Sequence, residues 1–237
     1  LPLFVGKEDV RTYAWEKRLN IEEAGRMLRY RFLEKTAHEA GAARIATGHT
    51  LTDQAETVLI RILRGSGLRG LAGIYPAVEE MIIRPLIDVE REEIENYLEE
   101  RGIKFRIDQS NFDRRFLRNR IRLELLPYLR ENFEPEVVSH LGRLASILRE
   151  EESLLDKITR EKKKRAILKN NAQISLDLEF LSSLPRALSR RLAREFVSEL
   201  RGNLRDISFE DIESLLNLRE RKEYSLNKGF VLRREQG

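Results

Sequence analysis

The sequence contains no cysteine among its 237 residues. Without thiols the chain can form no disulfide, no iron–sulfur cluster, no cysteine zinc site and no thiol nucleophile. Long apolar runs are missing too, since the longest uncharged apolar stretches are far too short to span a bilayer. The chain also begins without the basic, apolar and small-residue regions of a secretion signal. We therefore expect a cytoplasmic protein with no membrane contact.

The positive charge of the chain is unevenly distributed. The net charge is only +4, yet residues 101–131 contain nine basic residues against four acidic ones. A second stretch, residues 157–169, contains seven basic residues and a single acidic one, Glu161. Such clusters suit a phosphate backbone, although Arg and Lys also commonly cover solvated helix faces. Both interpretations stay open at this stage.

Alternating strand and helix patterns in the first half predict an α/β fold. We expect helices over about 9–18, 21–39, 52–64 and 90–101. Short strands are expected over 44–48, 81–84 and 104–107, and Leu3-Phe4-Val5 resembles the end of another. Strands separated by such helices indicate a parallel, Rossmann-like sheet with helices on both faces. Because the chain starts inside an element and without Met, we expect its first strands to be missing.

The second half has a different pattern. Charged helical periodicity runs from residue 116 to about 168, and a smaller helical α+β domain is expected after it. Its expected elements are a strand over 174–178, helices over 184–200 and 209–218, and a hairpin turning at Asn227-Lys228-Gly229 between 224–226 and 230–232. We therefore predict a catalytic domain over 1–130, and a linker helix with a C-terminal domain over 131–237.

One imidazole and two carboxylates lie where the strand over 44–48 should give way to a helix. These are His49, Asp53 and Glu56, and the two acids share a helix face. Ligands of parallel α/β sheets gather at the carboxyl ends of strands, so this is the expected site. The cluster could bind a metal ion or orient an amine nucleophile and take its proton. Carboxylates in the first turn of a helix are also favoured by the helix dipole alone.

Several sequence segments resemble those of the tRNA(Ile)-lysidine synthetases. These enzymes belong to the PP-loop superfamily of N-type ATP pyrophosphatases. The resemblance is strong over about residues 1–130 and mainly architectural beyond them. The matching segments are EEAGRMLRY at 22–30, ATGHTLTDQAETVL at 46–59, RGSGLRGLAG at 64–73, Arg84-Pro85-Leu86, Asp108-Gln109-Ser110-Asn111 and Arg118-Asn119-Arg120-Ile121-Arg122. The implied fold is that of the adenine nucleotide alpha hydrolases.

The resemblance implies an ATP-dependent ligase. In that family the wobble cytidine of the isoleucine tRNA with a CAU anticodon is adenylated at C2, and free L-lysine then displaces AMP. Decoding changes from AUG to AUA. Transferred by position, the implied catalytic residues are Arg29, His49, Asp53 and Glu56. The carboxylates would bind and deprotonate the lysine ammonium, and Asp53 or Glu56 could also bind Mg²⁺.

Arg29 could neutralise phosphate charge or steady the adenylated intermediate, while His49 could simply position its neighbours. Contacts to tRNA need positive charge and hydrogen-bond donors on the surface. The residues expected to supply them are Arg64, Arg69, Arg114, Arg115, Arg118, Asn119, Arg120 and Arg122. A homodimer is compatible with the sequence.

The Ser-Gly-Gly-x-Asp-Ser loop, which binds the phosphates of ATP in this family, does not occur in these residues. Residues that bind ATP are therefore unknown, and we expect a truncated chain that does not form lysidine as it stands. Two alternatives follow. One is a non-catalytic fragment that binds tRNA, and the other is a PP-loop enzyme that thiolates tRNA, which the absence of cysteine disfavours.

Overall fold

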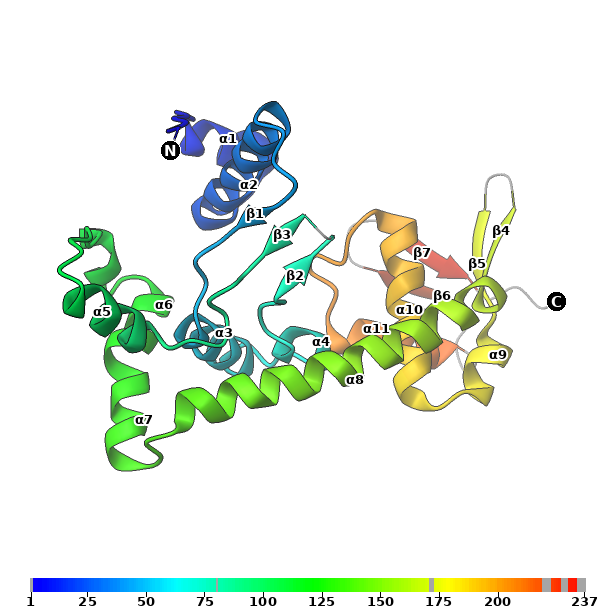
Figure 1. The fold of residues 1–237 in the computed structure, drawn as a ribbon. Coiled ribbons are helices and arrows are strands. Elements are labelled where there is room, and N and C mark those ends of the chain that lie inside the picture. The colour runs from blue at the N-terminus through cyan, green and yellow to red at the C-terminus, as the bar shows by residue number, and fades with distance from the viewer. Residues whose placement is uncertain (1, 80, 171–172, 219–222, 227–229, 234–237) are drawn as a thin grey trace. The chain divides into compact units, whose positions relative to one another are not determined.

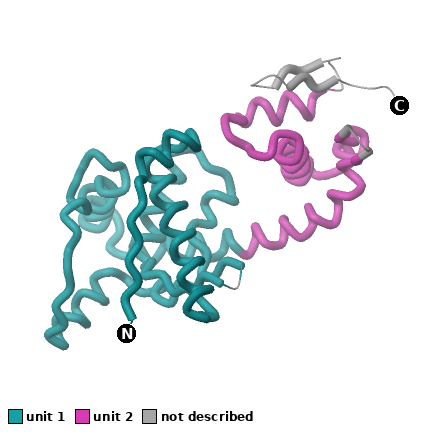
Figure 2. Tube along the Cα trace, turned by 90° about the horizontal axis from the view of Figure 1, so that it is seen from above, with its two compact units in different colours: residues 1–149 teal, residues 150–237 magenta. Residues whose placement is uncertain are grey.

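The computed structural model describes residues 2–79, 81–170, 173–218, 223–226 and 230–233 (Figure 1). The chain forms two compact units, Leu1–Arg149 and Glu150–Gly237 (Figure 2). The division lies within helix α8 (Val137–Ala166). A functional boundary after residue 130 stays a prediction. None of the helices among the described residues combines the length and apolar composition that a bilayer crossing requires.

The first two helices form where the sequence predicts them. Helix α1 (Val10–Lys17) is capped by Asp9, and α2 (Ile21–Glu39) is capped by Asn20, whose side-chain oxygen accepts a 2.8 Å hydrogen bond from the amide of Glu23. Side-chain caps of this kind satisfy amides that have no partner within the helix. Helix α2 ends just before Gly41, which adopts the left-handed conformation with φ of 63°.

A small mixed sheet lies in the first unit. Strand β1 (Ile45–Ala46) pairs in parallel with β3 (Ile82–Ile83), which confirms the predicted parallel relationship. Strand β2 (Ala77–Val78) was not predicted, and it pairs antiparallel with β3, so an entirely parallel sheet was wrong. The connection from β2 to β3 is a few residues long, and a parallel pair needs a much longer crossover. Buried Ala37 of α2 packs with residues of β1 and β3 in one core.

Two segments predicted as strands are irregular in the structure. Neither Leu3–Val5 nor Lys104–Ile107 pairs with another strand among the described residues. Their apolar side chains lie largely in solvent, with 87% of Leu3 and 57% of Ile107 exposed. A strand needs a hydrogen-bonded neighbour to satisfy its backbone, so an apolar, β-branched composition does not suffice.

Helix α3 (Leu51–Leu63) is the main helix around the predicted site. Its apolar face packs against residues that follow much later in the chain, in a core made of Ala55, Ile121, Leu126 and Val138. Between this helix and the short α4 (Leu68–Leu71), Gly65 adopts φ of 66°, consistent with a glycine that ends a turn. Helix α5 (Arg91–Glu100) follows the sheet.

The next helical stretch contains a π turn. After the 3₁₀ turn η1 (Gln109–Phe112), the chain runs through α6 (Leu117–Arg120), the π-helical η2 (Ile121–Leu125) and α7 (Leu126–Asn132) without a break. Pro127 cannot donate an amide and its ring would crowd the preceding turn of a regular helix. A wider π turn directly before it relieves this conflict, and π turns are often found at functional sites.

The second unit contains the rest of α8 and a helical core. Strands β4 (Ile167–Asn170) and β5 (Gln173–Leu176) pair antiparallel, as do β6 (Glu223–Leu226) and β7 (Phe230–Arg233). Helices α9 (Leu178–Ser183), α10 (Arg186–Arg201) and α11 (Phe209–Leu216) bury apolar faces that include Leu192, Phe196 and Leu215. Strand β4 lies where the helix was expected to continue. The turn predicted at 227–229 is outside the described residues.

Candidate functional site

The site is built around the start of α3. The chain leaves β1, passes Thr47 and His49, and enters the helix at Thr50, which forms a capping box with Asp53. The Thr50 hydroxyl and the Thr50 amide each donate to Oδ2 of Asp53 at 2.9 Å. The Asp53 amide donates back to the Thr50 hydroxyl at 3.2 Å. Thr50 therefore caps the helix, one oxygen of Asp53 accepts the return hydrogen bonds from Thr50, and the other oxygen of Asp53 is available for further contacts.

Two arginines that lie more than sixty positions away in sequence bind both carboxylates. Arg118 donates through Nε to Oε2 of Glu56 at 2.7 Å and through Nη2 to Oδ1 of Asp53 at 3.2 Å. Arg122 donates through Nε to Oε1 of Glu56, and its Nη2 lies 3.0 Å from Oε2 of Glu56 and 3.1 Å from Oδ1 of Asp53. A third guanidinium, that of Arg91, lies 3.8 Å from the same Asp53 oxygen. The five charged groups form one connected network, called the carboxylate network below.

Burial makes this network energetically important. Glu56 has no exposed surface and Asp53 is 7% exposed, so both carboxylates have lost most of their hydration. Burial acts to raise the pKa of Asp53, but the Thr50 amide, Arg118 and the Thr50 hydroxyl outweigh it and lower the pKa below its usual value. Asp53 is therefore negatively charged at neutral pH and is a weak proton acceptor.

His49 lies next to this network and is half-buried. Its Nδ1 is 3.0 Å from the Thr47 hydroxyl. Burial and the positive charge of Arg84 lower the pKa of His49, while Asp53 acts in the opposite direction. The imidazole is therefore neutral at physiological pH, and one ring nitrogen can accept a proton or a hydrogen bond.

Arg84 is a charged residue that the sequence-based prediction did not include in the site. It directly follows β3 and is only 5% exposed. Its guanidinium donates to the carbonyl of Tyr75 and lies 3.4 Å from the Tyr30 hydroxyl, and its Nε has no partner among the described residues. An arginine that interrupts an apolar strand pattern, as in Met81-Ile82-Ile83-Arg84, was the available signal. We interpret Arg84 as a source of positive potential beside His49.

Arg29 is not part of the carboxylate network. It lies exposed on α2, and none of the hydrogen bonds or ion pairs found within the described residues joins it to Asp53 or Glu56. Arg64 and Arg69 are likewise exposed, near α4. The structure thus brings together three of the four predicted catalytic residues and leaves the role of Arg29 a prediction.

The residues predicted to contact tRNA divide into two groups. Arg114, Arg115 and Arg120 display 70%, 87% and 60% of their side chains to solvent. In contrast, the guanidinium groups of Arg118 and Arg122 bind the buried carboxylates. Asn119, 8% exposed, donates its amide to the carbonyls of Ser110 and Asp113 at 2.8 and 2.9 Å. RNA contact by Arg118, Asn119 and Arg122 stays a prediction, because in this structure their side chains have partners within the protein.

Mg²⁺ does not fit the carboxylate network as it stands. The oxygens of Asp53 and Glu56 already accept hydrogen bonds from Thr50, Arg118 and Arg122, and guanidinium groups occupy the positions a cation would take. Among the described residues no group of three or more His, Asp or Glu side chains has the geometry of a metal site. We therefore assign no step to a metal ion here.

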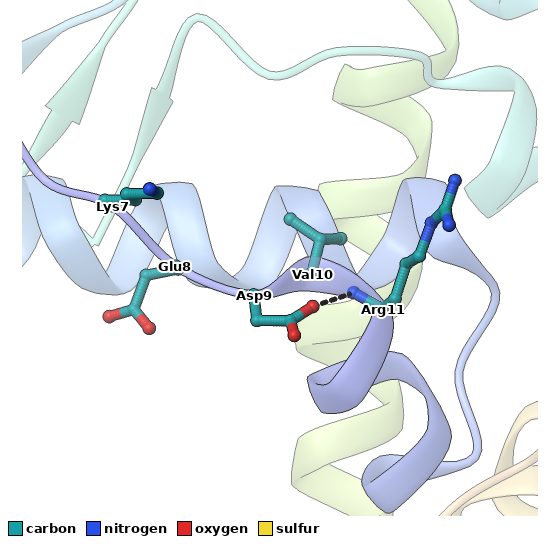
Figure 3. Close-up of a pocket in the computed structure, with 5 residues that line it drawn as sticks. All are labelled: Lys7, Glu8, Asp9, Val10 and Arg11. Carbon is teal, nitrogen blue, oxygen red and sulfur yellow. Dashed lines mark hydrogen bonds between the residues drawn. The ribbon is translucent and has the colours of Figure 1, made fainter.

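A hollow of about 600 Å³ is lined by residues 7–11, at the start of α1 (Figure 3). The Asp9 carboxylate points along the helix start, where it accepts hydrogen bonds from the amides of Arg11 and Thr12 at 3.0 and 3.1 Å. Its chemistry is that of a helix cap, and none of the predicted site residues lines this hollow.

A charged cluster after a strand of an α/β unit is typical of domains that bind nucleotides. Residues 1–129 match the PP-loop domain, and the chain belongs to this family.

Proteins named tRNA(Ile)-lysidine synthase are similar to a larger part of the chain than the 129 residues that match the PP-loop domain. The one from Caldanaerobacter subterraneus subsp. tengcongensis is 40% identical over 218 residues, which cover 92% of this chain and 46% of that protein. The Geobacter sulfurreducens protein is 41% identical over 219 residues, 91% of this chain and 46% of that protein. The Clostridioides difficile protein is 34% identical over 232 residues, 98% of this chain and 50% of that protein. The chain spans about half the length of these curated relatives.

Proposed function

We propose that this protein acts in the ATP-dependent ligation of L-lysine to C2 of the wobble cytidine of the isoleucine tRNA with a CAU anticodon. The similarity to proteins named tRNA(Ile)-lysidine synthase supports the reaction class. The observation on which the proposal depends most is the convergence of Asp53 and Glu56 beside His49, at the exit of β1 in a PP-loop domain. Neither a thiolation enzyme nor a bare RNA-binding fragment is favoured by these relatives.

ATP would supply the activation: the C2 oxygen of the cytidine would form a bond to the α-phosphorus of ATP, the bond between the α- and β-phosphates would break, and pyrophosphate would leave. The lysine ε-amine then attacks C2, a carbon–nitrogen bond forms, the bond from C2 to the oxygen breaks, and AMP leaves. An ammonium cannot attack until it has lost a proton. The residues of this chain therefore have two tasks in the lysine step, which are to attract the cationic side chain and to accept its proton.

Asp53 and Glu56 are suited to the first task. Their negative charges are held in place by the carboxylate network, and the lowered pKa of Asp53 keeps its charge at neutral pH. Arg118 and Arg122 bind these oxygens in the structure, so a lysine ammonium would have to replace a guanidinium group there, and that of Arg91, 3.8 Å from Oδ1 of Asp53, is the most loosely held. We assign the second task to His49, because a neutral imidazole accepts a proton more readily than a carboxylate whose pKa is lowered.

The remaining assignments concern RNA and the two halves of the chain. We propose that exposed arginines bind tRNA phosphates, a role that depends on charge more than on geometry. These are Arg64, Arg69, Arg114, Arg115 and Arg120. We further propose that residues 1–130 supply the catalytic domain, that 131–237 supply a linker helix and a tRNA-binding domain, and that the protein works in the cytoplasm. Formation of a homodimer belongs to the same set of proposals.

The test uses residues 1–237 joined behind a segment that contains a Ser-Gly-Gly-x-Asp-Ser loop. AMP release is measured with ATP and tRNA, with and without L-lysine. We expect release that depends on lysine and on the CAU anticodon. Binding of tRNA without turnover would overturn the ligase proposal in favour of a binding fragment, and turnover that requires a sulfur donor would overturn it in favour of thiolation.

A further inference from the structure

Two exposed aromatic rings flank a pair of arginines between η1 and α6. The segment is Phe112-Asp113-Arg114-Arg115-Phe116. Phe112 is 53% exposed and Phe116 is 54% exposed. A phenyl ring cannot form ordinary hydrogen bonds with water and is usually buried. Two exposed rings in one short segment therefore indicate a surface that binds a ligand or partner.

The backbone of the segment is held by buried and local hydrogen bonds. The side-chain amide of Asn119 donates to the carbonyls of Ser110 and Asp113 at 2.8 and 2.9 Å. The amide of Phe116 donates to the Asp113 carbonyl at 3.2 Å, and Asp108 accepts from the amide of Ser110 at 2.9 Å. The rings are therefore displayed from a preorganised turn, which lowers the entropy that a ligand must overcome on binding.

Positive charge accompanies the rings. Arg115 is 87% exposed and is held by two oxygens of Asp113, with Nη2 at 2.7 Å from Oδ2. The hydrogen bond from Arg115 lowers the pKa of Asp113, so this pair stays charged at neutral pH. Arg114 is 70% exposed and only loosely paired, with its Nε 3.6 Å from Glu124. Both guanidinium groups have donors left for an anion in solvent.

We propose that Phe112 and Phe116 stack on unpaired bases of an RNA loop while Arg114 and Arg115 contact the adjacent phosphates. Aromatic rings interleaved with arginines are the combination by which proteins bind single-stranded nucleic acid, because every base has a stacking face and every nucleotide has a negative charge. A protein partner would have to supply apolar groups that cover the rings and, beside them, negative charges that pair with both guanidinium groups. The identity of the loop as the anticodon loop of a tRNA rests on the proposed function above.

The experiment measures binding of the 237-residue chain to an anticodon stem-loop RNA that carries 2-aminopurine in its loop, and to a fully paired duplex of the same composition. The variants are F112A, F116A and the double variant. Phe133 provides a matched control, because it is 70% exposed but lies between Asn132 and Glu134, without arginines beside it. Each ring removed should weaken loop binding about tenfold, whereas F133A should leave it unchanged.

Stacking also predicts how the effect depends on RNA structure and salt. The double variant should bind the duplex as the parent does, should lose the quenching of 2-aminopurine, and should keep the same slope of affinity against salt. The variant R114A should instead reduce that slope. Replacement of both rings by leucine, which keeps an apolar side chain, provides a second double variant with the same expected loss if alanine disturbs folding.

Three results would overturn the proposal. The first is full affinity of the double variant for the loop, and the second is an equal loss of its affinity for loop and duplex. The third is self-association of the parent chain through these rings, detected by light scattering, with RNA binding unaffected, which would make a second copy the occupant. A loss of stem-loop affinity in the variants supports stacking. If the parent chain also binds loops of other sequence equally well, only the tRNA specificity of the proposed function is contradicted.

Discussion

Arg122 binds Glu56 through two nitrogens of one guanidinium, with Nη2 at 3.0 Å from Oε2 and Nε hydrogen-bonded to Oε1. Glu56 has no exposed surface, and the Arg122 side chain is 16% exposed. The pair joins α3 to the π turn η2, two elements whose apolar residues share one core. It therefore has two consequences, one for the stability of this unit and one for the position of the carboxylates.

Replacing Arg122 by methionine should destabilise the protein strongly. The change keeps an apolar stem of similar length but leaves the buried Glu56 with one fewer cation. Breaking a buried ion pair by removal of one partner costs about 3–5 kcal/mol. The free energy of unfolding, measured by urea titration, should fall by this amount, and the double variant R122M/E56Q should lose less than the sum of the single changes.

The control for this prediction is Arg115, which pairs with Asp113 at the surface. The variant R115M should change the free energy of unfolding by no more than about 1 kcal/mol, because exposed ion pairs contribute little. Equal losses for R122M and R115M would show that the buried network does not contribute to stability in the way that its geometry indicates.

The stability of the protein should depend on the ionisation of Asp53. Its pKa in the folded state is lowered, so the unfolded chain, with a carboxyl pKa of about 3.9, takes up the proton first as pH falls. The stabilisation is therefore present above about pH 5 and is lost as pH falls through the folded pKa. The variant D53N should show a smaller fall in unfolding free energy across this acidic range. An identical pH profile for D53N and the parent would contradict the assignment.

His49 should titrate below the ordinary histidine value. Burial and Arg84 disfavour its charged form, whereas Asp53 favours it. An NMR titration of the imidazole should give a pKa below about 6.5. The variant D53N should lower this pKa further, and E39Q, at an exposed position paired with Lys35, should leave it unchanged. A pKa at or above that of free histidine would remove the basis for His49 as the proton acceptor.

Local signals in the sequence predicted the helices well and the strands poorly. Asn20 marks the start of α2 as predicted, because its side chain satisfies a helix amide. Helix α3 begins at Leu51, close to the predicted start at about residue 52, with Thr50 as its cap. The strands β1, β2 and β3 are only two residues long, and pairing with a distant segment decides whether they form. The expected strand over 104–107 has a suitable composition and no neighbour among the described residues.

In the candidate site, too, the features set by local sequence could be predicted and those set by distant residues could not. The i, i+3 spacing of Asp53 and Glu56 placed both on one helix face, and the structure has them there. Their partners could not be inferred from spacing, because Arg118 and Arg122 are distant in sequence and belong to a basic stretch that also suits RNA. The π turn that contains Arg122 lies directly before Pro127, and hydrophobic periodicity does not predict such a turn.

The charge of Asp53 can be removed with little change in the shape of its side chain. The variant D53N has nearly the same shape and can still accept the hydrogen bond from the Thr50 amide, but it lacks the negative charge that would attract a lysine ammonium. Lysidine formed on the CAU-anticodon tRNA is measured by mass spectrometry, with residues 1–237 joined behind the phosphate-binding loop and with E39Q as the control. We expect about 100-fold or greater loss for D53N with unchanged tRNA binding, and full activity for E39Q. Lysidine formation by D53N at the rate of the parent would contradict this expectation.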